Sequence, residues 1–290
     1  MSEKLYGRIR TQLEEMKNNG TYKEYRYLES PMSAHTRIEN KGDVLVLCSN
    51  NYLGLSDKEE LIQSGIRALQ EYGAGGASVR FICGTYDIHR DLENKVAEFL
   101  GTEAALTYSS CWSANTAVIP ALLQPGDTVI SDALNHASIV DGCRLIAKGV
   151  NKAIYRHSDM SDLEEKLKEA MDSPVRLVLT DGVFSMEGDI ARLPEIVELV
   201  RRYDAVLLVD DSHATGVIGE TGRGTAEYYH MQGQVDIITG TFGKALGGAG
   251  GGFVAGRKPL IDLCVQASRP HLFSNSLPPV LTAIARTALE

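Results

Sequence analysis

The sequence predicts an α/β domain with a mostly parallel β-sheet and helices on both faces. Short apolar segments alternate along the chain with segments of helical periodicity, which is the pattern of repeated βαβ units. The apolar segments are continuous, as in Ala205-Val-Leu-Leu-Val209, and such runs are typical of strands that are buried on both faces. A chain of 290 residues that is 43% hydrophobic is long enough to bury one large core.

The periodicity places the individual elements in order. Apolar residues spaced by three and four indicate an amphipathic helix at 3–17, and we expect residues 1–44 to be an amino-terminal segment and 45–290 the large domain. The other predicted elements are strand 43–48, helices 58–72 and 87–100, strand 104–108, helix 112–123, strand 127–131, helix 137–147, strand 175–180, helix 193–203, strands 205–210, 236–240 and 251–255, and helix 279–290.

Composition excludes several classes of function. The net charge of −9, without a long basic run, argues against nucleic acid or an anionic membrane as the main partner. Five cysteines without CxxC spacing favour reduced thiols in a cytoplasmic protein over a disulfide framework or a metal site. No signal-peptide core and no stretch of about 20 apolar residues is present, so the sequence supports neither secretion nor membrane spanning.

Lys244 is the most informative single residue. It follows the apolar segment 236–239 and lies in a run of glycines and other small residues that extends to Phe253. A lysine becomes a nucleophile toward aldehydes when it is desolvated enough to be partly neutral, and glycines let a planar group approach the backbone. We therefore interpret Lys244 as a Schiff-base lysine. The alternative is a solvated loop lysine.

A second group of polar residues ends the predicted strand 205–210. Asp210 is followed by Asp211, Ser212 and His213, and ligands of open α/β sheets bind at the carboxyl ends of strands. Pyridoxal phosphate needs a lysine for its aldehyde and an acidic partner for its ring nitrogen, so Asp210 and Lys244 together fit this cofactor. Taken singly, Asp210 could be a helix cap and His213 a structural histidine.

Three further turns between strands and helices carry candidate ligands. Ser110, Cys111 and Trp112 lie near a helix amino terminus, where free amides bind phosphate, although a serine-capped helix start explains them equally well. His136 lies at another such turn and could stack on a flat cofactor or move a proton. Ser185 follows the strand 175–180 and could reach the same crevice, while turn chemistry alone explains its neighbouring glycines.

Together these segments resemble the α-oxoamine synthases, a branch of the fold-type I pyridoxal-phosphate enzymes. The resemblance runs from about residue 45 to the end, and its specific blocks are Cys48-Ser-Asn-Asn-Tyr-Leu-Gly-Leu55, Ala77-Ser-Val-Arg-Phe-Ile-Cys-Gly-Thr85, Ile130-Ser-Asp-Ala-Leu-Asn-His-Ala-Ser138 and Val209-Asp-Asp-Ser-His-Ala-Thr-Gly216. The resemblance implies a fold-type I large domain and a homodimer with shared active sites.

The resemblance also implies a role for each matching residue. Lys244 would form the Schiff base, Asp210 would pair with the pyridine nitrogen, and His213 would bond to the ring oxygen. His136 would stack over the ring. The remaining implied contacts are the phosphate contacts of Cys111, Trp112 and Thr241, the ring contact of Ser185, the substrate contact of Asn50, and the contacts of Ser274 and Asn275 with the phosphate in the neighbouring subunit's site.

The implied reaction joins glycine to acetyl-CoA, or runs in reverse with CoA, in threonine breakdown. A related enzyme that uses alanine and a longer acyl-CoA for biotin synthesis, or one that accepts both pairs, is the first alternative; an inactive cofactor-binding protein is the second. Members of the family continue into a carboxy-terminal small domain with an arginine for the substrate carboxylate, whereas this sequence stops at Glu290. We therefore expect that arginine to be missing and glycine to bind poorly; undiminished glycine binding would instead point to another arginine, such as Arg269 or Arg80.

Overall fold

The computed structural model describes residues 2–290, which form two units, residues 2–47 and 48–290. The first unit consists of helix α1 (Glu3–Asn18) and an antiparallel pair of short strands, β1 (His35–Ile38) and β2 (Gly42–Leu45). Helix α1 is amphipathic in sequence, yet none of its residues is buried. The predicted strand 43–48 corresponds to β2, which ends earlier than expected and pairs with β1.

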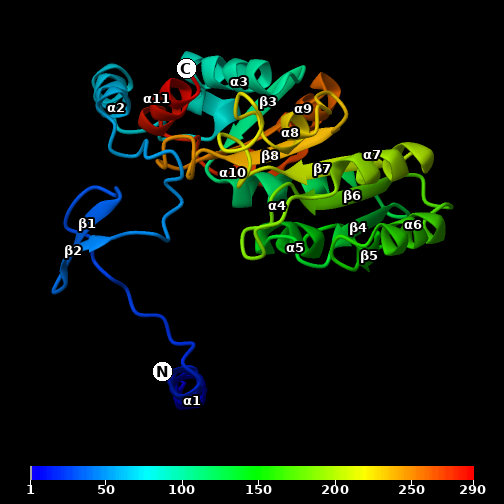
Figure 1. Cartoon of the computed structure of the whole chain (residues 1–290), viewed down its shortest axis with the longest axis horizontal. Coiled ribbons are helices and arrows are strands. Elements are labelled where there is room, and N and C mark those ends of the chain that lie inside the picture. Colours follow the sequence, from blue (N-terminus) through cyan, green and yellow to red (C-terminus); the bar gives the residue numbers. More distant parts are fainter. Residues whose placement is uncertain (1) are drawn as a thin grey trace. The chain divides into compact units, whose positions relative to one another are not determined.

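The second unit is built on one seven-stranded sheet (Figure 1). Its strands are β3 (Ala104–Tyr108), β4 (Thr128–Asp132), β5 (Asn151–Tyr155), β6 (Arg176–Asp181), β7 (Val206–Asp210), β8 (Ile237–Thr241) and β9 (Gly252–Gly256). The strand order is β3-β9-β8-β7-β6-β4-β5, and β9 alone runs in the opposite direction to the other six strands. The expected mostly parallel sheet is confirmed.

The helices of this unit connect the strands and cover both faces of the sheet (Figure 1). They are α2 (Glu59–Tyr72), α3 (Asp87–Leu100), α4 (Cys111–Leu122), α5 (Ala137–Arg144), α6 (Met160–Glu169), α7 (Leu193–Arg202), α8 (Thr225–Tyr228), α9 (Lys258–Ala267), α10 (Arg269–Phe273) and α11 (Pro279–Ala288), with a π-helical turn at Arg80–Gly84. Within residues 2–290, no helix combines the length and the apolarity that crossing a bilayer requires.

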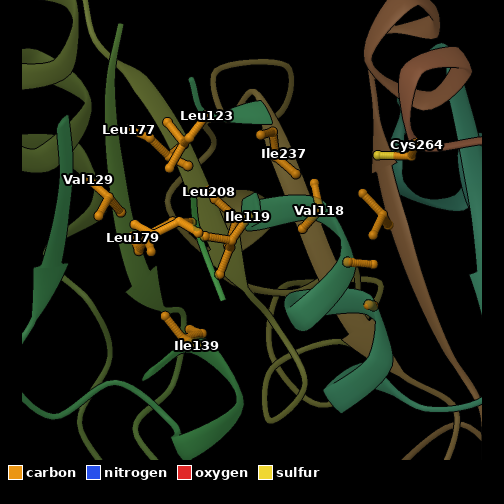
Figure 2. Close-up of a cluster of buried hydrophobic side chains, with 14 of the residues drawn as sticks. Val118, Ile119, Leu123, Val129, Ile139, Leu177, Leu179, Leu208, Ile237 and Cys264 are labelled. Atoms are coloured by element: carbon orange, nitrogen blue, oxygen red, sulfur yellow. The ribbon is translucent and has the colours of Figure 1, made fainter. Parts of the chain in front are cut away.

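Alternate residues of the central strands enter different core clusters. Leu208 of β7 belongs to a cluster that includes residues of α4, α5 and α9, among them Ile119, Ile139 and Cys264 (Figure 2). Its neighbours Leu207 and Val209 pack on the opposite face with residues of α6 and α7. A third cluster covers the β8–β9 region with residues of α3 and α11. Successive side chains of a strand point to opposite faces of the sheet, which explains this division. Because both faces are covered, the strands must be apolar throughout.

The parallel strands bring several polar residues to one edge of the sheet. Strands β4, β6, β7 and β8 run in the same direction, so their last residues lie at the same edge. These residues are Asp132, Asp181, Asp210 and Thr241. Asp181 and Asp210 are direct partners in the register of β6 and β7. This edge is where open α/β folds bind their ligands.

Candidate active site

A pocket of about 200 Å³ lies at this edge of the sheet. Strand ends, the loop that follows β8 and the amino termini of two helices contribute to it. Its lining residues are Ser110, Cys111, Trp112, His136, Ser138, Asp181, Asp210, Ser212, His213, Thr241 and Lys244. Eight of the residues predicted from the sequence therefore share one pocket: Ser110, Cys111, Trp112, His136, Asp210, His213, Thr241 and Lys244.

Lys244 projects into this pocket from the loop between β8 and β9. Its Nζ lies 2.7 Å from Nε2 of His213, and no carboxylate forms an ion pair with it among the described residues. Burial lowers the pKa of Lys244 from its ordinary value, although the charge of Asp210 opposes this shift. A lysine in this state has a larger neutral fraction and is a better nucleophile and base.

A chain of hydrogen bonds fixes the proton of His213. Tyr52 donates its hydroxyl hydrogen to Oδ1 of Asn50 at 3.1 Å, so its oxygen accepts from Nδ1 of His213 at 2.9 Å. His213 is therefore protonated on Nδ1, and its Nε2 accepts from Nζ of Lys244. Burial, reinforced by the charge of Lys244, lowers the pKa of His213 to about 4, in agreement with a neutral ring.

Asp210 is the best-anchored carboxylate of the pocket. Its Oδ2 accepts from Nδ2 of Asn115 at 2.6 Å, and its Oδ1 accepts from the backbone amide of Ser212 at 3.0 Å. The thiol of Cys111 lies 3.7 Å from the same carboxylate. Burial and the nearby charge of Asp210 raise the pKa of this thiol, so Cys111 is a buried neutral group and not a nucleophile.

A second carboxylate, Asp181, lines the pocket beside Asp210. Its Oδ2 accepts from the backbone amide of His136 at 2.9 Å, and its own amide donates to Oδ1 of Asn135. Burial and the charge of Asp210 raise the pKa of Asp181. The pocket therefore holds two carboxyl groups in different environments, since Asp210 receives several donors and Asp181 receives one.

The amino terminus of α4 forms one wall of the pocket. Ser110 caps the helix by accepting from the amide of Ser113 at 3.0 Å, which leaves the first helical amides, those of Cys111 and Trp112, directed out of the helix end. Gly252 of β9 permits this close approach, because a Cβ at this position would lie 2.3 Å from the nitrogen of Cys111. Such a helix terminus is suited to a phosphate.

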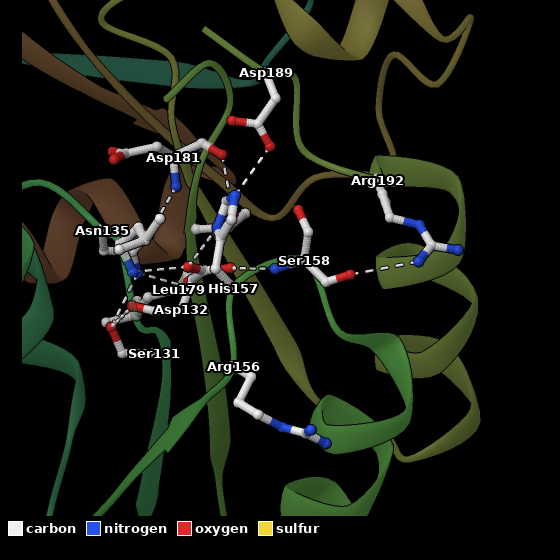
Figure 3. A network of polar contacts seen from close by, with 12 residues as sticks. Ser131, Asp132, Asn135, Arg156, His157, Ser158, Leu179, Asp181, Asp189 and Arg192 are labelled. Carbon is white, nitrogen blue, oxygen red and sulfur yellow. Dashed lines mark hydrogen bonds and ion pairs between the residues drawn. The ribbon is translucent and has the colours of Figure 1, made fainter. Parts of the chain in front are cut away.

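His136 occupies the start of α5 and is held by its surroundings. Its ring lies edge-on to that of Trp112, with centroids 5.9 Å apart and an interplanar angle of 83°. The preceding residue, Asn135, bonds to Ser131 and to the carbonyl of Leu179 (Figure 3). These bonds tie the turn that carries His136 to strands β4 and β6.

A further contact network supports the neighbouring loop 182–190. His157 bridges two carboxylates, with Nδ1 at 2.9 Å from Asp132 and Nε2 at 2.9 Å from Asp189 (Figure 3). Bonds to these carboxylates outweigh the opposing effect of burial, so the pKa of His157 is raised. Phe184 of this loop is buried against the ring of His157, at a centroid distance of 4.4 Å.

Four predicted site residues lie outside the pocket. Ser185 is exposed at the tip of the loop 182–190, and Asn50 reaches the site only through Tyr52 and His213. Ser274 and Asn275 are exposed and line a separate, small depression with Arg80 and His271. The structure of one chain therefore gives these four residues no direct contact with the pocket.

Arg80 and Arg269, the two alternatives for binding a substrate carboxylate, contact other side chains. Arg80 forms a bidentate pair with Glu93, at 2.9 and 3.2 Å, and also bonds to Thr107. The guanidinium of Arg269 lies over the ring of Phe273 at 5.0 Å. Neither side chain lines the pocket, so the suggestion that one of them grips a substrate carboxylate receives no support from this geometry.

Several site residues were not predicted. Asp181, Ser138 and Ser212 line the pocket. Asn115 bonds to Asp210, and Tyr52 bonds to His213. Asp181 could have been found, because it ends an apolar strand in the same way as Asp210. No signal in the sequence points to Asn115, since it lies in the middle of a helix and is buried by the fold.

The chemistry of the pocket fits pyridoxal phosphate. It combines an amine of lowered pKa, a carboxylate at a strand end and a helix amino terminus for a phosphate. In addition, the hydroxyl of Ser212 is buried at the pocket without a hydrogen-bond partner among residues 2–290, as expected of a group that serves a ligand. Within the same residues, no cluster of His, Cys, Asp and Glu could hold a metal ion.

Comparison with known proteins agrees with this class of site. The family model "Aminotransferase class I and II" matches residues 42–290, and the chain belongs to this family of fold-type I pyridoxal-phosphate enzymes. Serine palmitoyltransferase from S. paucimobilis, solved with a PLP-myriocin aldimine, superimposes with a TM-score of 0.90 at 34% identity, over 97% of this chain and 72% of that one. The solved 8-amino-7-oxononanoate synthase from Francisella tularensis gives a TM-score of 0.71 at 26% identity, over 83% and 67% of the two chains.

Relatives of this chain within the family carry two enzyme names. The mitochondrial 2-amino-3-ketobutyrate coenzyme A ligase of Homo sapiens is 52% identical over 287 residues, covering 99% of this chain and 68% of that protein. The ligase of the same name from Escherichia coli K12 is 48% identical, over 100% of this chain and 73% of its own length. The 8-amino-7-oxononanoate synthase of Thermoanaerobacter pseudethanolicus is 49% identical, over 97% and 71%.

Proposed function

We propose that this chain is a pyridoxal-phosphate-dependent C-acyltransferase of the glycine C-acetyltransferase type. It condenses glycine with acetyl-CoA to 2-amino-3-oxobutanoate and CoA, or catalyses the reverse, in threonine degradation. The observation on which the proposal depends is the convergence of Lys244, Asp210 and the amino terminus of α4 on one pocket. The choice of reaction within the family follows the relatives named 2-amino-3-ketobutyrate coenzyme A ligase.

Each group of the pocket has a proposed task. Nζ of Lys244 would bind the aldehyde carbon, the carboxylate of Asp210 would face the ring nitrogen, and the amides of Cys111 and Trp112 with Thr241 would hold the phosphate. When bound, pyridoxal phosphate supplies a ring that accepts electron density from the α-carbon of an attached amino acid. His213 would contact the ring oxygen, and the ring of His136 would cover the face of the cofactor.

The chain's own residues move the protons. Once the amine of glycine has replaced it on the cofactor, the freed Nζ of Lys244, whose pKa burial lowers, would take the proton from the α-carbon of glycine. His136 donates a hydrogen bond to the substrate carboxylate, or to the thioester oxygen as negative charge builds on that oxygen. Both groups line the same pocket, so substrate and acyl donor meet between them.

A second candidate is 8-amino-7-oxononanoate synthase activity, which joins alanine to pimeloyl-CoA. A relative of that name is 49% identical, so overall identity does not separate the two activities. Assays of glycine and alanine with acetyl-CoA and pimeloyl-CoA decide between them. We expect the pair glycine and acetyl-CoA to have the highest kcat/KM; the highest value for alanine and pimeloyl-CoA would support the second candidate, and turnover of no pair would indicate an inactive cofactor-binding chain.

The assembly is the remaining part of the proposal. We propose a homodimer in which Ser274 and Asn275 contact the phosphate in the partner's site, because both are exposed and lie outside the pocket of their own chain. Ser185 and Asn50 are proposed to contact the ring and the substrate once both are bound. Residues 45–290 are proposed as the large domain. The cytoplasmic location stays a prediction, since relatives include mitochondrial and bacterial proteins.

A further inference from the structure

A buried hydrogen-bond chain links Asp210 to His136 through two residues without a role so far. Asn115 of α4 has an exposed fraction of 0%, and its Nδ2 donates to Oδ2 of Asp210 at 2.6 Å and to Oγ of Ser138 at 2.9 Å. Ser138 has an exposed fraction of 1%, and its Oγ lies 2.7 Å from Nδ1 of His136. The four side chains form one continuous path along the pocket.

The direction of each bond follows from the donors that are available. The opposite orientation of the Asn115 amide would place its oxygen against the carboxylate of Asp210, so electrostatics fixes the amide with Nδ2 toward the carboxylate. Its two hydrogens are then used by Asp210 and Ser138. The oxygen of Ser138 therefore accepts from Asn115, and its single hydroxyl hydrogen remains for one further bond.

That hydrogen points to His136. Nδ1 of His136 is the only other partner of the Ser138 hydroxyl among residues 2–290, at 2.7 Å. The backbone amide of Ser138 also donates to the same Nδ1, at 3.3 Å. Two donors directed at Nδ1 require a nitrogen without a proton, so the proton of the neutral ring resides on Nε2.

We propose that Asn115 and Ser138 are positioning residues that hold His136 in the Nε2-protonated form and fix the orientation of the Asp210 carboxylate at the same time. His136 then presents an N–H donor to the pocket and cannot act there as a base in its resting form. The use of this donor toward a substrate oxygen depends on the proposed function. The position of the proton does not, and it can be measured in the absence of any substrate.

Long-range proton–nitrogen NMR of the full chain, with and without pyridoxal phosphate, tests the proton position. The chain has seven histidines, and the signals of His136 are assigned by their loss in His136→Asn. At a pH of about 8, above the ordinary histidine pKa of about 6.5, neutral rings are observed. We expect a bare Nδ1 and a protonated Nε2 for His136 in the wild type. A proton on Nδ1 would overturn the proposal, whether or not the variants below fold.

Ser138→Ala then tests the path itself. Removal of the hydroxyl deletes the shorter of the two bonds to Nδ1, so we expect a measurable fraction of the Nδ1-protonated ring and a kcat lowered by roughly tenfold. Thr116→Ala is the matched control, because the hydroxyl of Thr116 is on the same helix as Asn115 and bonds only to carbonyls of that helix. An unchanged His136 spectrum in Ser138→Ala would show that Ser138 does not set the proton. A changed spectrum in a chain without acyltransferase activity would uphold the inference and reject the proposed function.

Discussion

Asp181 and Asp210 are register partners at the ends of neighbouring parallel strands, and both are connected to His136. Asp181 accepts the backbone amide of His136 directly. Asp210 reaches the imidazole through Asn115 and Ser138. The sheet register therefore sets the distance between the residue proposed for the ring nitrogen and the residue proposed for the face of the ring.

Asp210→Asn is expected to lower kcat by at least two orders of magnitude. The substitution removes the charge proposed to face the ring nitrogen, and loss of such a preorganised interaction costs about 3 to 4 kcal/mol. Steady-state kinetics measures the effect, with Asp262→Asn as an exposed control on α9. A decrease of less than about tenfold, or ~1.4 kcal/mol, would indicate a structural role for Asp210.

Gly252→Ala is expected to weaken cofactor binding and lower thermal stability. The new Cβ would lie 2.3 Å from the nitrogen of Cys111 and 2.5 Å from the carbonyl carbon of Ser110, so the start of α4 must move away from β9. Overpacking of this kind costs about 1 to 3 kcal/mol. Fluorescence titration with pyridoxal phosphate and a melting curve measure both effects.

Gly75→Ala is the control for this substitution, because a Cβ at Gly75 meets nothing within 4 Å. Wild-type affinity for pyridoxal phosphate in Gly252→Ala would contradict a phosphate site at the start of α4.

Ser274→Ala is expected to lose cofactor more readily than the wild type while it remains a dimer. Ser274 is exposed and is not part of the pocket of its own chain, so its proposed contact lies in the partner subunit. Light scattering gives the assembly, and dialysis followed by absorbance gives the retained cofactor. Ser161→Ala, an exposed serine on α6, serves as the control. A wild-type monomer with one tightly held cofactor per chain would refute the shared site.

His271→Phe is expected to remove part of the acid sensitivity of folding. Burial, together with the charge of Arg80, lowers the pKa of His271 to about 4, whereas an unfolded histidine has a pKa of about 6.5. The unfolded state therefore binds a proton that the folded state does not, and stability is lost as the pH falls from about 6.5 to about 4. The slope from one such group is at most about 1.4 kcal/mol per pH unit.

Urea unfolding of the wild type and of His271→Phe at several pH values measures this slope. Phenylalanine keeps an aromatic ring next to Tyr108, whose ring centroid lies 5.8 Å from that of His271. His230→Gln, at an exposed position, is the control. Equal slopes for all three proteins between these pH values would show that His271 does not contribute.

Most of the sheet could be predicted from the sequence, because its strands are buried on both faces and are therefore apolar throughout. Strand β5 and helix α6 were missed for the opposite reason. β5 contains the exposed residues Asn151 and Lys152 at the edge of the sheet, and α6 is rich in charged residues. Their positions are determined by packing against β4 and the rest of the core, which local periodicity does not report.

The same distinction applies to the site. Lys244, Asp210, His213 and His136 follow strand ends, so their meeting in one pocket is a consequence of parallel strands, which the sequence indicates. The helix-buried Asn115 and the path through Ser138 depend on how α4 and α5 pack on the sheet. That geometry requires the three-dimensional structure.

The proposed function requires Lys244 to bind pyridoxal phosphate covalently. The most direct measurement is borohydride reduction of the cofactor-loaded chain, followed by proteolysis and mass spectrometry, with Lys244→Ala and the surface variant Lys258→Ala treated in parallel. We expect one phosphopyridoxyl group per chain, located on Lys244, present in Lys258→Ala and lost in Lys244→Ala. A label on another lysine of the wild type, or an equal label in Lys244→Ala, would contradict it.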